Sequence, residues 1–243
     1  GICYIPTRRF KRAKRIIWAS NKTTFLISRE FDQQLETEVK SFSRDFRNVH
    51  PIIVFRRHDS FVASQYRRFV KNGYRLKFHE FFDLKDDKGH FKRKDLDYNS
   101  QIRILEEHFD QRPIVLIYDD LKQNPKKFIQ SFSEIVGAQV NIDRVDFSRK
   151  HRSYSEKQLK VMQKCSRRFN LRKRRIFDSR LLHFFWKLYI GAIRYSILYI
   201  ARLVPDHLLN DKPLIDPRRL EEVRIHYDQD WLRVLNSPYC KRV

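Results

Sequence analysis

One stretch of the chain joins a buried strand to a helix with almost no loop between them. Residues 50–73 read HPIIVFRRHDSFVASQYRRFVKNG. The four apolar residues at 52–55, bounded by a proline and by paired arginines, are typical of a buried strand. Asp59 favours the start of a helix, and Asn72-Gly73 favours its end. The strand-to-helix junction therefore indicates an α/β fold.

The same junction carries groups that bind anions. Arg56 at the end of the strand, the hydroxyl of Ser64 and the N-terminal amides of the helix are able to converge on one phosphate. A structural role is the alternative for each residue. Arg56 would then pair with Asp59 or Asp120, and Ser64 would be a small residue packed against the sheet.

Strand and helix patterns alternate along the rest of the chain. Residues 31–46 have apolar positions three and four apart, as in an amphipathic helix, and residues 113–121 form a second apolar strand. A strand, the helix at 31–46 and the strand at 52–55 form a βαβ unit, which predicts parallel strands. Further helices are expected at 98–109, 124–137, 155–175, 181–204 and 216–234. Residues 79–94 lose periodicity and gain charge around a glycine, so we expect them to form a loop. We predict an α/β protein, with a short parallel sheet flanked by helices and a helical C-terminal part, in a single domain over residues 1–243.

Two motifs resemble those of the sulfotransferase superfamily. Arg56 and Ser64, eight positions apart across the strand-to-helix turn, are similar to the family's motif for the 3′-phosphate of 3′-phosphoadenosine-5′-phosphosulfate (PAPS). Residues 118–121 read YDDL and are followed by Pro125 and by Val136-Gly137, which resembles a second family block. Two motifs in the family's order, about sixty residues apart, are much harder to obtain by chance than one. The resemblance covers residues 20–235 approximately.

The resemblance implies a P-loop-NTPase-like sulfotransferase fold and transfer of a sulfuryl group from PAPS to a hydroxyl or amine. Adenosine 3′,5′-bisphosphate would be the nucleotide product, and no metal is implied. The matching positions imply cofactor-binding roles for Arg56, Ser64, Arg68, Tyr118 and Lys150. Residues 21–25, NKTTF, resemble a family segment that lies between the cofactor loop and the Arg56/Ser64 motif, and this implies a catalytic role for Lys22. Lys22 would stabilise charge near the transferring group, whereas Tyr118 would contact the adenine. The alternative for Tyr118 is a core tyrosine of the second strand, with its hydroxyl satisfied locally.

The family's loop around the 5′-phosphosulfate, commonly Pro-Lys-x-Gly-Thr-Thr, is not found in this sequence. The chain has five glycines, and none lies in that context. Residues 22–24 match only the end of the loop and have no glycine before them. We therefore expect the domain to be truncated at its N-terminus, without the cofactor loop and without the general base that usually follows it.

The formal net charge of +23 predicts an anionic partner. Within the sulfotransferase interpretation, this charge favours an anionic carbohydrate acceptor and no specific nucleic acid. Two alternatives remain: a basic module that binds polyanions or nucleic acid, and an inactive sulfotransferase-like scaffold at a membrane. Basic runs at residues 8–15 and 167–175 fit either a polyanion site or a solvated surface.

Residues 181–204 are the most apolar part of the chain. Lys187, Arg194 and Arg202 interrupt them, and each cation would cost about 2.5–3.5 kcal/mol at a bilayer centre. We therefore expect a helix that packs on the domain or lies on an anionic membrane surface. The three scattered cysteines favour a reducing compartment, and hence a cytoplasmic, membrane-associated protein, although a lumenal enzyme with few disulfides would look the same.

Overall fold

The computed structural model describes residues 2–5, 24–27, 35–44, 49–137, 139–148, 154–172, 176–209 and 211–242. The chain divides into two compact units. The sheet unit comprises Gly1–His58, Lys94–Arg149 and His226–Val243, and the helical unit comprises Asp59–Arg93 and Lys150–Ile225. The single domain expected from the sequence stays a prediction.

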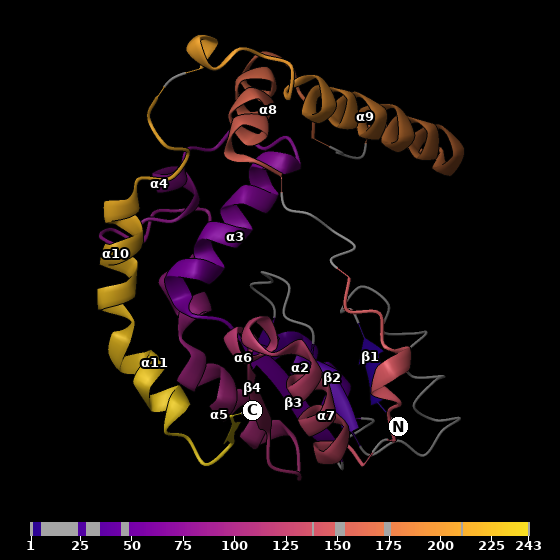
Figure 1. Cartoon of the computed structure of the whole chain (residues 1–243), viewed down its shortest axis with the longest axis vertical. Helices are drawn as coiled ribbons and strands as arrows, with labels where there is room; N and C mark the ends of the chain where they lie inside the picture. Colours follow the sequence, from indigo (N-terminus) through magenta and orange to yellow (C-terminus); the bar gives the residue numbers. More distant parts are fainter. Residues whose placement is uncertain are drawn as a thin grey trace. The chain divides into compact units, whose positions relative to one another are not determined.

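The sheet unit is built on a five-stranded sheet in which every neighbouring pair is parallel (Figure 1). Its strands follow the order of the chain: β1 (Ile2–Ile5), β2 (Thr24–Ile27), β3 (His50–Phe55), β4 (Ile114–Ile117) and β5 (Cys240–Lys241). Between β2 and β3 lies α2 (Leu35–Ser43). The expected βαβ unit and the α/β class with a parallel sheet are thus confirmed.

Helices cover both faces of the sheet because residues along each strand alternate between the faces. Ile53 and Ile117 point to the face covered by α2, α5 (Tyr98–His108) and α11 (Asp228–Leu235). Ile52 and Leu116 point to the opposite face, where they pack against α7 (Pro125–Ile135). Since both faces are buried, the strands are continuous apolar runs, as the sequence suggested.

The helical unit contains the greater part of α3 (His58–Lys71) and of α10 (Pro217–His226), together with α4 (Phe78–Phe81), α8 (Glu156–Arg168) and α9 (Arg180–Ile200). Other short helices in the described ranges are α6 (Tyr118–Gln123) and the 3-10 helices η2 (Arg93–Leu96), η3 (Ile142–Arg144) and η4 (Asp206–Leu208). Of the helices in the described ranges, none is both long enough and apolar enough to cross a membrane.

Several helix ends lie where the sequence predicted them. Ser155 and Gln158 form a reciprocal capping box at the start of α8, and the side chain of Asn124 accepts a hydrogen bond from the amide of Lys127 in α7. Gly73 follows α3 with φ of +79°, and Gly137 follows α7 with φ of +62°. Both glycines therefore adopt the left-handed conformation typical of a helix C-terminus.

Four expectations about local structure were wrong. The helix expected at 155–175 ends at Arg168, where Phe169 takes an extended conformation. The predicted strand at 113–121 ends at Ile117, and α6 begins at Tyr118, where two acidic residues in the first turn favour a helix N-terminus. The predicted C-terminal helix is divided at Tyr227, which is buried against other rings of the sheet unit. The segment at 79–94, expected to be a loop, contains part of α4 and a bridge between Phe82 and Phe91, because these phenylalanines are buried.

Candidate functional site

The candidate site lies at the carboxyl ends of β3 and β4. Phe55 and Ile117 are paired across the two strands, so the next residues, Arg56 and Tyr118, leave the sheet side by side. The guanidinium carbon of Arg56 lies 5.0 Å from the centre of the Tyr118 ring. In open α/β sheets, ligands bind outside the carboxyl ends of the strands. At this edge of the sheet, a guanidinium suited to a phosphate thus lies beside an aromatic ring suited to stacking on a nucleobase.

Tyr118 is 36 % exposed, so the alternative that it is a core tyrosine is wrong. Arg56 is half-buried. Near the same sheet edge, Arg242 forms a bidentate ion pair with the buried Asp120, with nitrogen–oxygen distances of 2.9 and 3.0 Å. This pair joins the segment after β5 to the segment after β4.

Tyr98 fixes the backbone of Arg56. Its hydroxyl donates a hydrogen bond of 2.7 Å to the carbonyl oxygen of Arg56, and its ring stacks on Phe55 with 4.2 Å between ring centres. Tyr98 is 1 % exposed, so this hydrogen bond is shielded from competing water. The arginine at the strand end therefore extends from a rigid point.

His58 lies two residues after Arg56 and holds the other end of the same turn. Its Nε2 is 3.0 Å from Oδ2 of Asp230 and 3.0 Å from the carbonyl oxygen of Leu96, so Nε2 donates. The imidazole is stacked between Tyr98 and Tyr227, at ring distances of 4.0 and 4.6 Å. Because His58 is 1 % exposed, it positions the turn and has no route to a reacting group.

Asp230 accepts hydrogen bonds from several residues around His58. Besides His58, the amide of Tyr98 donates to it at 3.1 Å, and the side-chain amide of Asn99 donates to it as well. Burial acts to raise the pKa of Asp230, but the hydrogen bonds from His58, Asn99 and Tyr98 outweigh it, and the pKa lies below its ordinary value. The carboxylate therefore stays charged in the folded sheet unit.

The other predicted site residues lie elsewhere in the chain. Ser64 and Arg68 are one turn apart on the part of α3 that belongs to the helical unit; Ser64 is half-buried and Arg68 is exposed. Their joint action with Arg56 stays a prediction. Lys22 and Lys150 lie outside the described residues.

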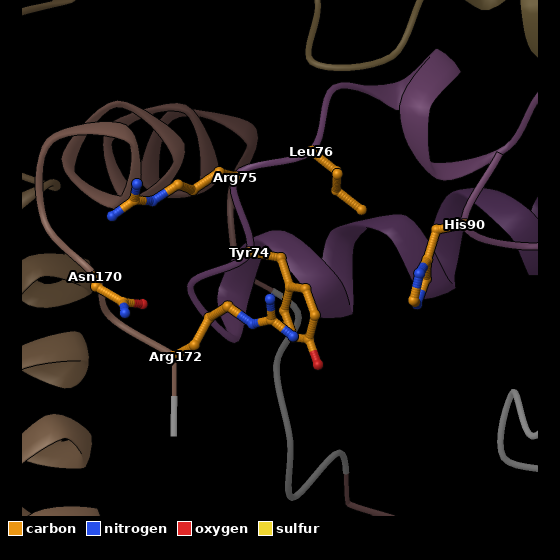
Figure 2. Close-up of a pocket in the computed structure, with 6 residues that line it drawn as sticks. All are labelled: Tyr74, Arg75, Leu76, His90, Asn170 and Arg172. Carbon is orange, nitrogen blue, oxygen red and sulfur yellow. The ribbon is translucent and has the colours of Figure 1, made fainter. Parts of the chain in front are cut away.

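Two of the pockets in the described part of the chain are lined by residues of the helical unit alone. Figure 2 shows the smaller, of about 280 Å³, where the guanidinium of Arg172 lies over the ring of Tyr74 at 4.0 Å. The larger, of about 490 Å³, is called the basic pocket. Its cationic lining residues are Lys77, Lys160, Lys164, Arg167 and Lys212, and none of the described residues that line it is acidic.

Two hydrogen bonds hold Tyr66 in place where it lines the basic pocket. The hydroxyl of Tyr66 donates to the carbonyl oxygen of Leu76 at 3.0 Å and accepts from the side-chain amide of Gln163 at 2.8 Å. Burial raises the pKa of Tyr66 to about 12, although the hydrogen bond from Gln163 acts in the opposite direction. The tyrosine therefore stays neutral, and the charge of the pocket comes from its lysines and arginine.

Sequence reasoning missed both the His58–Asp230 pair and the basic pocket. The pair joins residues 172 positions apart, and its only sequence signal is that Asp230 directly precedes Trp231 on an apolar helix stripe. The pocket draws its cations from three separate segments. Through the described part of the chain, no three His, Cys, Asp or Glu side chains gather to hold a metal ion.

Comparisons with known proteins found no match: no family model fits the chain, and neither a curated protein nor a solved structure is similar to it.

Proposed function

We propose that this chain is a PAPS-dependent sulfotransferase with the P-loop-like fold of that family, and that it transfers a sulfuryl group to a hydroxyl or amine of an anionic carbohydrate. One observation supports the proposal most strongly. The guanidinium carbon of Arg56 lies 5.0 Å from the centre of the Tyr118 ring, at the carboxyl ends of adjacent parallel strands. These are the residues that the motif resemblance assigns to the 3′-phosphate and to the adenine.

In the proposed reaction, the bond between sulfur and the phosphate oxygen of PAPS breaks as the acceptor oxygen or nitrogen bonds to sulfur. Negative charge then grows on the bridging oxygen, and cations stabilise it. Lys22 would be the cation that stabilises the bridging oxygen, while Arg56, Ser64 and Arg68 hold the 3′-phosphate. Lys150 would add charge beside the nucleotide. The acceptor's proton must pass to a base within hydrogen-bond reach.

Recognition of the 3′-phosphate tests the proposal. We expect the chain to bind adenosine 3′,5′-bisphosphate at least about tenfold more tightly than adenosine 5′-monophosphate, since charge-assisted hydrogen bonds contribute about 1.5–3 kcal/mol. Arg56→Ala should remove this preference, whereas Arg57→Ala, the same change one position later, should retain it. Isothermal titration of both nucleotides measures the ratio. Equal preference in wild type and Arg56→Ala would refute the assignment.

Polyanion binding is the second candidate function, and the basic pocket favours it. Five cations around about 490 Å³ suit a sulfated or carboxylated oligosaccharide, because pockets of this size enclose small ligands. The field of clustered charge strengthens inside a concave site. Binding of this kind requires neither Arg56 nor a nucleotide.

We expect Lys164→Glu combined with Arg167→Glu to weaken binding of a heparin-derived tetrasaccharide about tenfold, because two phosphate-like contacts are lost and two repulsions are added. Lys126→Glu combined with Lys127→Glu, on the exposed side of α7, changes the net charge equally and is the control. Fluorescence titration over a range of salt concentrations measures both variants. Equal weakening would show that net charge, and not the pocket, binds the oligosaccharide.

A further inference from the structure

One side of α9 carries large apolar side chains that the described residues of the helical unit leave exposed. Among them, each between 54 % and 67 % exposed, are Leu181, Phe184, Phe185, Leu188, Tyr189 and Tyr199. These six residues are called the outer face of α9. On a helix with 100° between successive residues, they and the small residues between them form a broad uncharged stripe. Soluble monomers rarely expose an apolar patch of this extent.

The opposite side of α9 is fixed to the helical unit. Leu198 packs with Met162 and Leu171, and its carbonyl oxygen accepts a hydrogen bond of 2.7 Å from Gln158. Nη1 of Arg194 donates at 2.9 Å to the carbonyl oxygen of Asn72. Figure 1 shows α9 beside α8 near its C-terminal end and extending away from α8 toward its N-terminal end. Because these contacts set the rotation of the helix, the outer face cannot turn inward without breaking them.

Cations border the outer face along one side. Arg180, Lys187 and Arg202 are all exposed. The guanidinium carbon of Arg202 lies 5.0 Å from the centre of the Tyr199 ring, so this charge stands directly at the margin of the apolar stripe. Phenolic rings beside a basic margin are the arrangement that suits the boundary between acyl chains and headgroups.

We propose that α9 lies in the plane of an anionic lipid bilayer, with its outer face among the upper acyl chains and its basic margin at the headgroups. A membrane fits better than a second copy of the chain. Two copies, each with a net charge of +23, repel one another, whereas an anionic surface neutralises that charge. The helix lies on the bilayer without crossing it, in keeping with the three cations along its length.

Co-sedimentation with vesicles tests the proposal. We expect binding to phosphatidylcholine vesicles with about 30 % phosphatidylserine, weaker binding to phosphatidylcholine alone, and loss of the difference at high salt. Phe185→Asn combined with Leu188→Asn should weaken partition into the anionic vesicles by about tenfold or more, since each apolar side chain contributes more than 1 kcal/mol when buried. Ile225→Asn, at a position 68 % exposed on α10, is the control and should bind as wild type does.

A second readout measures immersion directly. With Trp18, Trp186 and Trp231 replaced by phenylalanine, fluorescence of Tyr189→Trp should be quenched by lipids brominated near the top of the acyl chain, whereas Ile225→Trp in the same background should be quenched little. Failure of wild type to bind anionic vesicles would overturn the proposal, as would equal binding by the double asparagine variant. The outer face would instead be assigned to a second copy of the chain by three results together. Light scattering would show that wild type is a dimer and that the double asparagine variant is a monomer, and wild type would not bind vesicles.

Discussion

Replacing Asp230 with alanine is expected to lower the free energy of unfolding of the sheet unit by about 3 kcal/mol, because the substitution strands several buried donors at once. His58 loses one of its two acceptors, and the amide of Tyr98 loses its hydrogen bond to the carboxylate. The side-chain amide of Asn99 also loses the carboxylate but keeps its hydrogen bond to the backbone carbonyl of residue 230. Removing one partner of a buried pair costs much more than removing an exposed charge. Urea unfolding, with hydrogen exchange of peptides from the sheet unit, measures the loss.

Asp228→Ala is the matched control. Asp228 is the first residue of the same helix, α11, but it is exposed. Its loss should cost less than about 1 kcal/mol, the usual contribution of an acidic residue near a helix N-terminus. Similar losses in the two variants would contradict the view that the His58–Asp230 pair holds the turn that carries Arg56.

The lowered pKa of Asp230 also predicts a dependence on pH. A carboxyl group whose pKa is depressed by folding contributes stability above its unfolded pKa, and this contribution is lost as the pH falls through the folded value. Wild type should therefore lose stability in acid below the ordinary range of an aspartate. Asp230→Asn, which keeps the shape without the charge, should lose less over that interval, as unfolding at a series of pH values would show.

Several elements of the fold were predicted correctly from local sequence signals. The run at 52–55, the asparagine and proline that open α7 and the capping box at Ser155 each depend on residues that are near neighbours in the chain. Their effect is decided within one turn or one strand, so sequence was sufficient. The parallel sheet followed from the βαβ order for the same reason.

The features that the sequence did not predict depend on contacts between residues far apart in the chain. Tyr227 interrupts the C-terminal helix while its ring stacks on His58, which lies far away in the chain. The approach of Arg56 to Tyr118 depends on the register between β3 and β4, and a shift of one residue would place them on opposite sides. The motifs named both residues of the candidate site, but only the strand register makes them neighbours.

Gly73→Ala is expected to destabilise the helical unit by about 3 kcal/mol, through two effects that add. Gly73 has φ of +79°, and a residue with a side chain loses about 1–2 kcal/mol in that conformation. A Cβ atom there would also lie 2.7 Å from the carbonyl oxygen of Leu171, which is backbone and cannot rotate aside. The chain must shift, and such overpacking costs about 1–3 kcal/mol more.

Gly137→Ala separates the two effects. Gly137 has φ of +62°, but a Cβ atom there would meet nothing within 4 Å, so only the conformational cost of about 1–2 kcal/mol applies. Hydrogen exchange read separately from peptides of each unit measures both losses. A larger loss at Gly73 should accompany opening of the pocket in Figure 2, because Tyr74 and Arg172 directly follow Gly73 and Leu171. Equal losses would mean that this close approach does not hold the pocket together.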